Sequence, residues 1–131
     1  MFDTELFATV TSGLVTVGAD VAAAHIDTRL AELNWHVCPV ACSAVTDKEQ
    51  LISAVADALS FPDWTSRNWD AFSDAMTDLS WLQQQRVALV LHDTAALGDA
   101  APDAWRVGRD SLNEAVEWWT DRSRALLVVV H

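Results

Sequence analysis

The stretch FPDWTSRNWDAFSDAMTDLSW, residues 61–81, decides how the rest of the chain is interpreted. Pro62 disfavours helical geometry at the residue before it, so a helix that arrives from the N-terminal side ends near Phe61. We predict a loop here, followed by a helix that runs to about Trp81. Three residues after Pro62 are of types that cap a helix N-terminus: Thr65, Ser66 and Asn68.

The predicted helix has two faces of different chemistry. Aspartates recur every fourth residue as Asp70, Asp74 and Asp78, which places them on one face. Like charges at this spacing destabilise a helix by about 0.2–0.5 kcal/mol per pair. The face is therefore either a solvated polar surface or a surface whose cations come from a binding partner. The other face has the apolar spacing of a helix packed on a core: Trp69, Phe72, Met76 and Leu79.

The composition limits the class of partner. The 131 residues include 19 acidic and 8 basic side chains, for a net charge of −11. Binding to nucleic acid needs a basic surface, so we expect no direct nucleic-acid ligand and instead a basic protein partner. The apolar fraction of 51% is that of a globular domain. No run approaches 18 apolar residues and no basic segment precedes an apolar one at the N-terminus, so we expect a cytoplasmic protein with no membrane contact.

The remaining sequence alternates between strand and helix patterns, which indicates an α/β fold with a mainly parallel sheet. Apolar blocks predict four strands, at residues 14–17, 35–42, 86–92 and 125–130. Apolar stripes predict helices at residues 20–34, 46–59 and 102–119, and one helical turn at 93–98.

Local signals refine these elements. Pro39 lacks a backbone donor and predicts an edge strand or a bulge. Asp20 is a candidate helix cap, and Thr46 to Glu49 fit a capping box.

The two cysteines, Cys38 and Cys42, fall within one predicted strand. Four strand residues separate their Cα atoms by about 13 Å, which is too far for a disulfide. We expect both to be free thiols in the core.

The segment PDWTSRNWDAFSDAMTDLSW resembles the signature of the barstar family, the small bacterial inhibitors of guanyl-specific ribonucleases. DKEQLISAVADAL, residues 47–59, is similar to the first helix of that family. Residues 78–82 and 115–119 resemble segments of its longer, actinobacterial-type members. The signature positions are carried by Pro62, Asp63, Trp64, Asn68, Trp69, Asp70, Ala71, Phe72 and Asp74.

The resemblance implies a single barstar-like domain over residues 1–131, with a core at 36–131 and an N-terminal extension at 1–35. The family fold is a sheet of three parallel strands flanked by helices. We expect the extension to add one helix and a candidate fourth strand, which gives a three- to four-stranded, mainly parallel sheet.

The resemblance also implies a function: inhibition of a basic, guanyl-specific extracellular ribonuclease by an acidic loop and helix that mimic RNA phosphate, without cofactor or metal. Asp74 stands at the position of the central carboxylate and Asp70 at that of its companion. Further contacts are implied for the loop aromatic Trp64, for Asn68 at the helix start, for Ser73, where the best-known member has Trp, for the rim hydroxyl of Thr77, and for Glu117, with Glu114 as the alternative.

Two other function classes share the same residues. An acidic immunity protein or antitoxin for a different basic toxin would use the same surface. A metal-dependent carboxylate enzyme would use Asp70 and Asp74, with His92 and Asp93 as the nearest additional ligands. The four histidines are scattered in the sequence and none belongs to a nucleophile motif.

Overall fold

A computed structural model describes residues 6–131; residues 1–5 of the extension lie outside the described residues. One sheet contains four parallel strands: β1 (Gly13–Thr16), β2 (His36–Ala41), β3 (Arg86–His92) and β4 (Ala125–Val130). Their order is β1-β4-β3-β2. The α/β fold and the parallel sheet are confirmed. The extension supplies the fourth strand, which pairs with β4 at the edge opposite β2.

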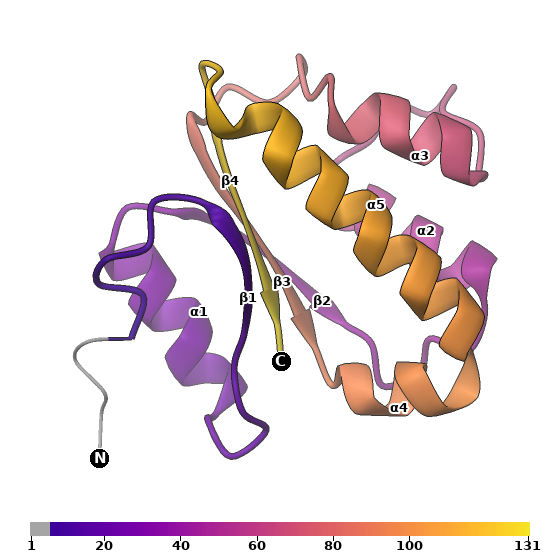
Figure 1. Cartoon of the computed structure of the whole chain (residues 1–131), viewed down its shortest axis with the longest axis horizontal. Coiled ribbons are helices and arrows are strands. Elements are labelled where there is room, and N and C mark those ends of the chain that lie inside the picture. Colours follow the sequence, from indigo (N-terminus) through magenta and orange to yellow (C-terminus); the bar gives the residue numbers. More distant parts are fainter. Residues whose placement is uncertain (1–5) are drawn as a thin grey trace.

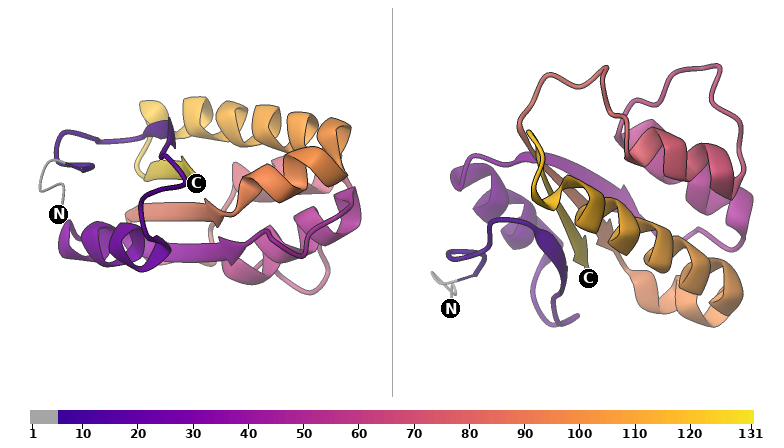
Figure 2. Two further views of the ribbon diagram at one scale, coloured as in Figure 1. Left: turned by 90° about the horizontal axis from the view of Figure 1, so that it is seen from below. Right: turned by 45° about the horizontal axis from the view of Figure 1, so that its top comes forward.

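Helices cover both faces of the sheet. They are α1 (Ala23–Glu32), α2 (Lys48–Ala58), α3 (Trp69–Met76), α4 (Thr94–Ala100) and α5 (Pro102–Thr120). Figure 1 shows α1 on one side of the sheet and α2, α3 and α5 on the other. In Figure 2, right, α1 and α3 lie at opposite ends of the molecule. Among the described residues, no helix is both long enough and apolar enough to span a membrane.

The central strand β3 is buried on both faces, as its uninterrupted apolar sequence predicts. Val87, Leu89 and Leu91 belong to the core beneath α2, α3 and α5. Ala88 and Val90 belong to a second core, beneath α1. This alternation follows from the two-residue period of a strand.

The edge strand β2 contains Pro39, which lies opposite Val90 in an uninterrupted register with β3. The prediction of an edge strand is confirmed, and no bulge is present along β2. An edge position tolerates proline because one side of the strand has no neighbour that needs its N–H.

Two predicted helix starts are wrong. Helix α1 begins at Ala23, and its N-cap residue is Ala22, without a side-chain bond, so Asp20 does not cap it. Helix α2 has its capping residue one position later than predicted. The Asp47 carboxylate accepts from the Gln50 N–H at 2.8 Å, while the Gln50 side chain accepts from the Thr46 N–H at 2.7 Å. Asp is as good a cap as Thr, and Gln50 completes the reciprocal pair from the third helical position.

The end of α3 is also earlier than predicted. The helix ends at Met76, not near Trp81, and Thr77 is its C-cap residue. Leu79 has a φ of 49° and is fully buried, so the chain turns sharply to place this side chain in the core. Asp78 therefore follows the helix and does not continue its acidic face.

Gly108 in α5 allows three helices to pack closely. A Cβ atom at this position would lie 2.9 Å from the Leu51 side chain of α2 and 3.1 Å from the Trp69 ring of α3. By contrast, a Cβ atom on Gly98 would lie 3.7 Å from Trp105, which is an ordinary contact. The absence of a side chain at residue 108 therefore decides how near α3 approaches α5.

We predict that Gly108→Val lowers the free energy of unfolding by about 1–3 kcal/mol, because the added methyl groups overpack this junction. Urea denaturation measures the change. Gly98→Val is the matched control and should show no such loss. Equal effects at the two glycines would contradict this account of the packing.

Both cysteines are buried free thiols, as predicted. Burial raises the pKa of the Cys38 thiol to about 11. Burial, and secondarily the charge of Asp93, raises the pKa of the Cys42 thiol to about 11. The folded chain therefore keeps these two protons at pH values where an unfolded chain releases them.

This difference predicts a pH dependence of stability. A pKa raised in the folded state stabilises the fold fully below the usual thiol pKa, and the contribution is lost as pH rises from about 9 to about 11. Urea denaturation across this window should show a decline that is steeper for the wild-type chain than for a Cys38→Ala/Cys42→Ala variant. Parallel pH profiles for the two proteins would contradict the prediction.

Candidate partner-binding surface

The loop before α3 is anchored by aromatic packing. The buried ring of Phe61 lies 6.2 Å from Phe72 and 5.7 Å, edge to face, from Trp81, measured between centroids. The Trp81 indole N–H donates to the Leu59 carbonyl at 2.9 Å. This bond ties the chain after α3 to the end of α2, so both ends of the loop–helix segment are fixed to the core.

Helix α3 is held against α5 by a second tryptophan. The Trp119 indole N–H of α5 donates to the Met76 carbonyl at 2.8 Å, within the last turn of α3. Trp69 of α3 packs edge to face on Phe72 at 5.3 Å and lies over Gly108. Buried hydrogen bonds and close ring packing make α3 a rigid support for its exposed side chains.

Asn68 is the N-cap of α3. Its side-chain oxygen accepts from the Ala71 N–H at 2.8 Å, and its backbone is extended as a capping residue requires. Of the three capping residues that the sequence offered, the structure uses this one. The carboxamide NH₂ of Asn68 remains exposed beside the first turn.

The aspartates of α3 are exposed and have no counter-ion in the part of the chain that the structure describes. Asp70 lies in the first turn and Asp74 one turn later, and both are exposed. Within residues 6–131, no ion pair involves either carboxylate. Asp70 lies near the positive end of the helix, which stabilises it. We call the exposed side chains of Trp64, Asn68, Asp70 and Asp74 the acidic surface.

A pocket of about 210 Å³ separates the loop from α3. Trp64 is 79% exposed at its rim, the largest exposed fraction among the big apolar side chains that the structure describes. The sequence placed Asp78 on the same face as Asp74 but did not predict it as a contact residue, and the structure places both carboxylates at this pocket. The complete lining is Trp64, Thr65, Ser66, Ala71, Asp74, Ala75, Asp78 and Trp81.

The other predicted contact residues take different positions. Ser73 is half-buried on α3 between the two aspartates. The Thr77 hydroxyl donates to the Ser73 carbonyl at 3.0 Å, so its proton is already hydrogen-bonded at the C-terminal end of α3. Glu117 is exposed on α5 and accepts from the Asn113 side chain at 3.4 Å. In the described part of the chain, no hydrogen bond or ion pair joins Glu117 to the loop or to α3.

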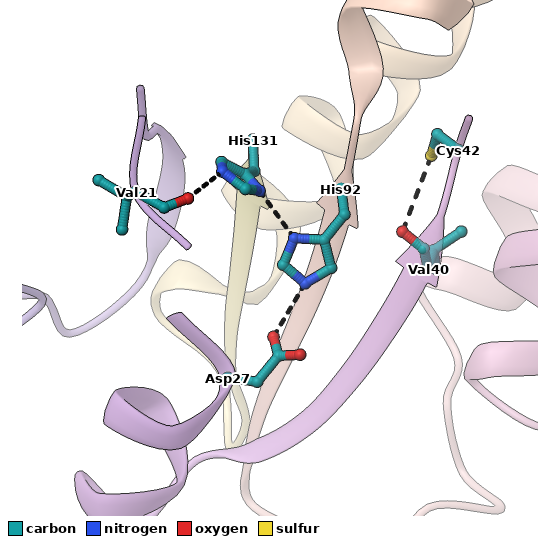
Figure 3. A network of polar contacts seen from close by, with 6 residues as sticks. All are labelled: Val21, Asp27, Val40, Cys42, His92 and His131. Atoms are coloured by element: carbon teal, nitrogen blue, oxygen red, sulfur yellow. Dashed lines mark hydrogen bonds and ion pairs between the residues drawn. The ribbon is translucent and has the colours of Figure 1, made fainter. Parts of the chain in front are cut away.

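Two histidines that are far apart in the sequence meet at the carboxyl ends of β3 and β4 (Figure 3). His92 Nδ1 lies 2.8 Å from His131 Nδ1. His92 Nε2 lies 3.0 Å from the Asp27 carboxylate of α1, and His131 Nε2 lies 2.7 Å from the Val21 carbonyl. His92 is the last residue of β3 and His131 directly follows β4, and neighbouring parallel strands end at the same sheet edge. That signal was present in the sequence.

Hydrogen-bond chemistry limits the possible donors in this network. The Val21 carbonyl only accepts, so this contact assigns a proton to His131 Nε2. The donor and the acceptor in the contact between the two Nδ1 atoms, and in the contact with Asp27, depend on which ring nitrogens carry a proton. The network joins the extension to β3 and β4.

No metal centre emerges from these residues. Across residues 6–131, no group of three or more His, Cys, Asp or Glu side chains is arranged to hold a metal ion. Asp70 and Asp74 lie on α3, whereas His92 ends β3 and Asp93 is the N-cap residue of α4. Figure 1 shows α3 and α4 far apart.

A comparison with known protein families matches residues 35–131 to the family described as Barstar (barnase inhibitor). No curated protein matches the chain. The family match includes β2 to β4, α2 to α5 and the whole acidic surface, whereas β1 and α1 lie before it.

We predict that Asn68→Ala lowers the free energy of unfolding by about 0.5–2 kcal/mol, because the Ala71 N–H loses its cap. Asn68→Asp keeps the accepting oxygen and should stay within about 0.5 kcal/mol of the wild type. Urea denaturation measures both. If the aspartate variant loses as much stability as the alanine variant, the capping role is wrong.

Proposed function

Because this chain belongs to the barstar family, we propose that it inhibits a basic, guanyl-specific bacterial ribonuclease by covering the active site of that enzyme. The observation that carries the proposal is the pair Asp70 and Asp74: exposed, free of internal ion pairs within the described residues, and fixed on a rigid helix. The exposed Trp64 beside them supplies an aromatic anchor.

The chemistry of the enzyme explains why carboxylates would serve. A ribonuclease active site holds a phosphodiester with cationic side chains. A carboxylate at the place of that phosphate accepts two parallel hydrogen bonds from one guanidinium group. The carboxylate has no bond that the enzyme can cleave, so the complex stays inhibited. Because α3 is already held by Trp69, Trp81 and Trp119, little conformational entropy is lost when Asp74 binds.

The net charge of −11 favours fast association with a basic partner. Opposite charges steer two proteins together and raise the association rate, an effect for which the barnase–barstar pair is itself a standard example. We propose that the inhibitor acts in the cytoplasm, where it protects the producing cell from the ribonuclease before export. Ser73, Thr77 and Glu117 would form the edge of the interface.

We predict that Asp74→Ala weakens inhibition by about 2–5 kcal/mol, a range established partly on the barnase–barstar pair itself, because a buried cationic group of the enzyme loses its partner. Asp78→Ala, which removes the second carboxylate of the pocket, should weaken inhibition far less. The inhibition constant is measured by titration against a guanyl-specific ribonuclease with a dinucleotide substrate. Both variants should unfold at nearly the wild-type urea concentration.

Asp99→Ala is the charge-matched control, since Asp99 is exposed on α4. If Asp74→Ala and Asp99→Ala weaken inhibition equally, only the net charge matters and the proposed interface is contradicted. Tight binding that leaves the ribonuclease active would instead favour an immunity protein or antitoxin for another basic toxin. The association rate should fall as salt rises.

A further inference from the structure

Three arginines line one pocket at the amino ends of β3 and β4. Arg86 begins β3, and Arg124 directly precedes Ala125, the residue that pairs with Arg86 in the register of the two strands. Arg122 lies just before them in the same turn. The pocket has a volume of about 450 Å³ and holds three of the eight basic residues of the chain. Four hydroxyl side chains also line the pocket, beside Gln85, Trp119 and Ala125: Thr11, Ser12, Thr120 and Ser123.

Each guanidinium group is held in place by a tryptophan. Arg86 lies 4.1 Å above the ring of Trp35. Arg122 lies 3.6 Å above Trp118, and Arg124 lies 5.5 Å from Trp119. Stacking of this kind restricts the side chain and leaves the edges of the guanidinium plane available for hydrogen bonds.

Backbone carbonyls accept one hydrogen bond from each arginine. Arg86 donates to the Leu33 carbonyl at 3.2 Å, and Arg124 donates to the Leu82 carbonyl at 2.8 Å. Arg122 donates to the carbonyl of Trp118. A guanidinium group has five N–H donors, so most of the donors of the three arginines are left for other acceptors.

The three arginines have no counter-ion among the described residues. Within residues 6–131, no ion pair involves Arg86, Arg122 or Arg124, although the chain carries 19 acidic residues. Arg86 Nε and Arg124 Nη1 are buried without a hydrogen-bond partner, as is the indole nitrogen of Trp35 beneath Arg86. Burial lowers the pKa of Arg124, because desolvation disfavours its charged form. Buried donors without acceptors are rare in folded proteins, so this cluster favours a ligand that accepts hydrogen bonds.

We propose that this arginine pocket binds a small oxyanion of the phosphate class. The tetrahedral oxygens of such an anion would accept hydrogen bonds from the guanidinium edges and the surrounding hydroxyls, and its charge would compensate the three cations. The ligand is small because the rest of the molecule is strongly acidic and would repel an extended polyanion such as a nucleic-acid strand. The proposed ribonuclease interface contains none of the three arginines, so variants of these arginines test this proposal separately from ribonuclease inhibition.

The test is a titration of the whole chain with inorganic phosphate at constant ionic strength, followed by isothermal calorimetry and by NMR of the arginine Nε–H and tryptophan indole signals. We expect saturable binding to one site, with shifts at Arg86, Arg124 and Trp119. Arg86→Gln and Arg124→Gln should each weaken binding about tenfold or more, because each removes a charge-assisted hydrogen bond. Non-saturable binding would overturn the proposal.

Arg109→Gln is the charge-matched control, since Arg109 is exposed on α5 and lines a different pocket. It should bind phosphate as the wild type does, and an equal loss would overturn the proposal. Because the Arg122 side chain is exposed, Arg122→Gln should leave the fold intact. This variant should also bind phosphate more weakly than the wild type. A nucleoside monophosphate that binds more tightly than inorganic phosphate would identify a nucleotide, and equal affinity would identify the free oxyanion. A nucleoside that binds as tightly as its monophosphate would contradict an anion site.

Discussion

The position of α3 depends on three indole rings, and the proposed interface depends on α3. A helix of eight residues is too short to be stable by itself. Trp119 donates to the carbonyl of Met76, Trp81 donates to the end of α2, and Trp69 fills the space that Gly108 leaves open. Because these contacts are all on the inner side of the helix, the aspartates on its outer side are fixed in direction without any bond of their own. Rigidity and an uncompensated charge are therefore produced by the same packing.

The acidic and the basic side chains gather at different places, and tryptophans support both groups. Acidic side chains on α3 are exposed and lack cations of this chain, within the described residues, while Arg86, Arg122 and Arg124 gather at the amino ends of two strands. Tryptophan serves both groups: three rings support α3, and three rings stack on the arginines, with Trp119 in both sets. Stacking on an aromatic ring holds a guanidinium group without neutralising it. Six of the seven tryptophans thus have a defined place in this arrangement when the exposed Trp64 is included, and Trp105 packs against the main core.

The sequence predicts those features that depend on local patterns. The apolar run of β3 indicates a strand covered on both faces, Pro39 indicates an edge, and alternating elements indicate a parallel sheet; the structure confirms all three. The sequence does not predict structural features that depend on contacts between residues far apart in the chain. The end of α3 is set by the turn that buries Leu79, which competes with a helical pattern continuing to residue 81. The roles of Asp70 and Asp74 stay predictions, since only their exposure and their lack of internal partners are visible in a chain without its partner.

The described part of the extension, residues 6–35, packs against the sheet. The strand β1 pairs with β4, and Ile26 and Leu30 of α1 are fully buried against the sheet face formed by Ala88, Val90, Leu127 and Val129. Without this cover, that face would be a contiguous apolar surface in water, which folded proteins rarely tolerate. Hydrogen bonds also join the extension to the sheet. Asp27 contacts His92 and the Val21 carbonyl contacts His131. Asp27 and Val21 precede the residues of the family match, whereas both histidines belong to it. The shared apolar core and these hydrogen bonds therefore join the extension and the sheet into one packed structure.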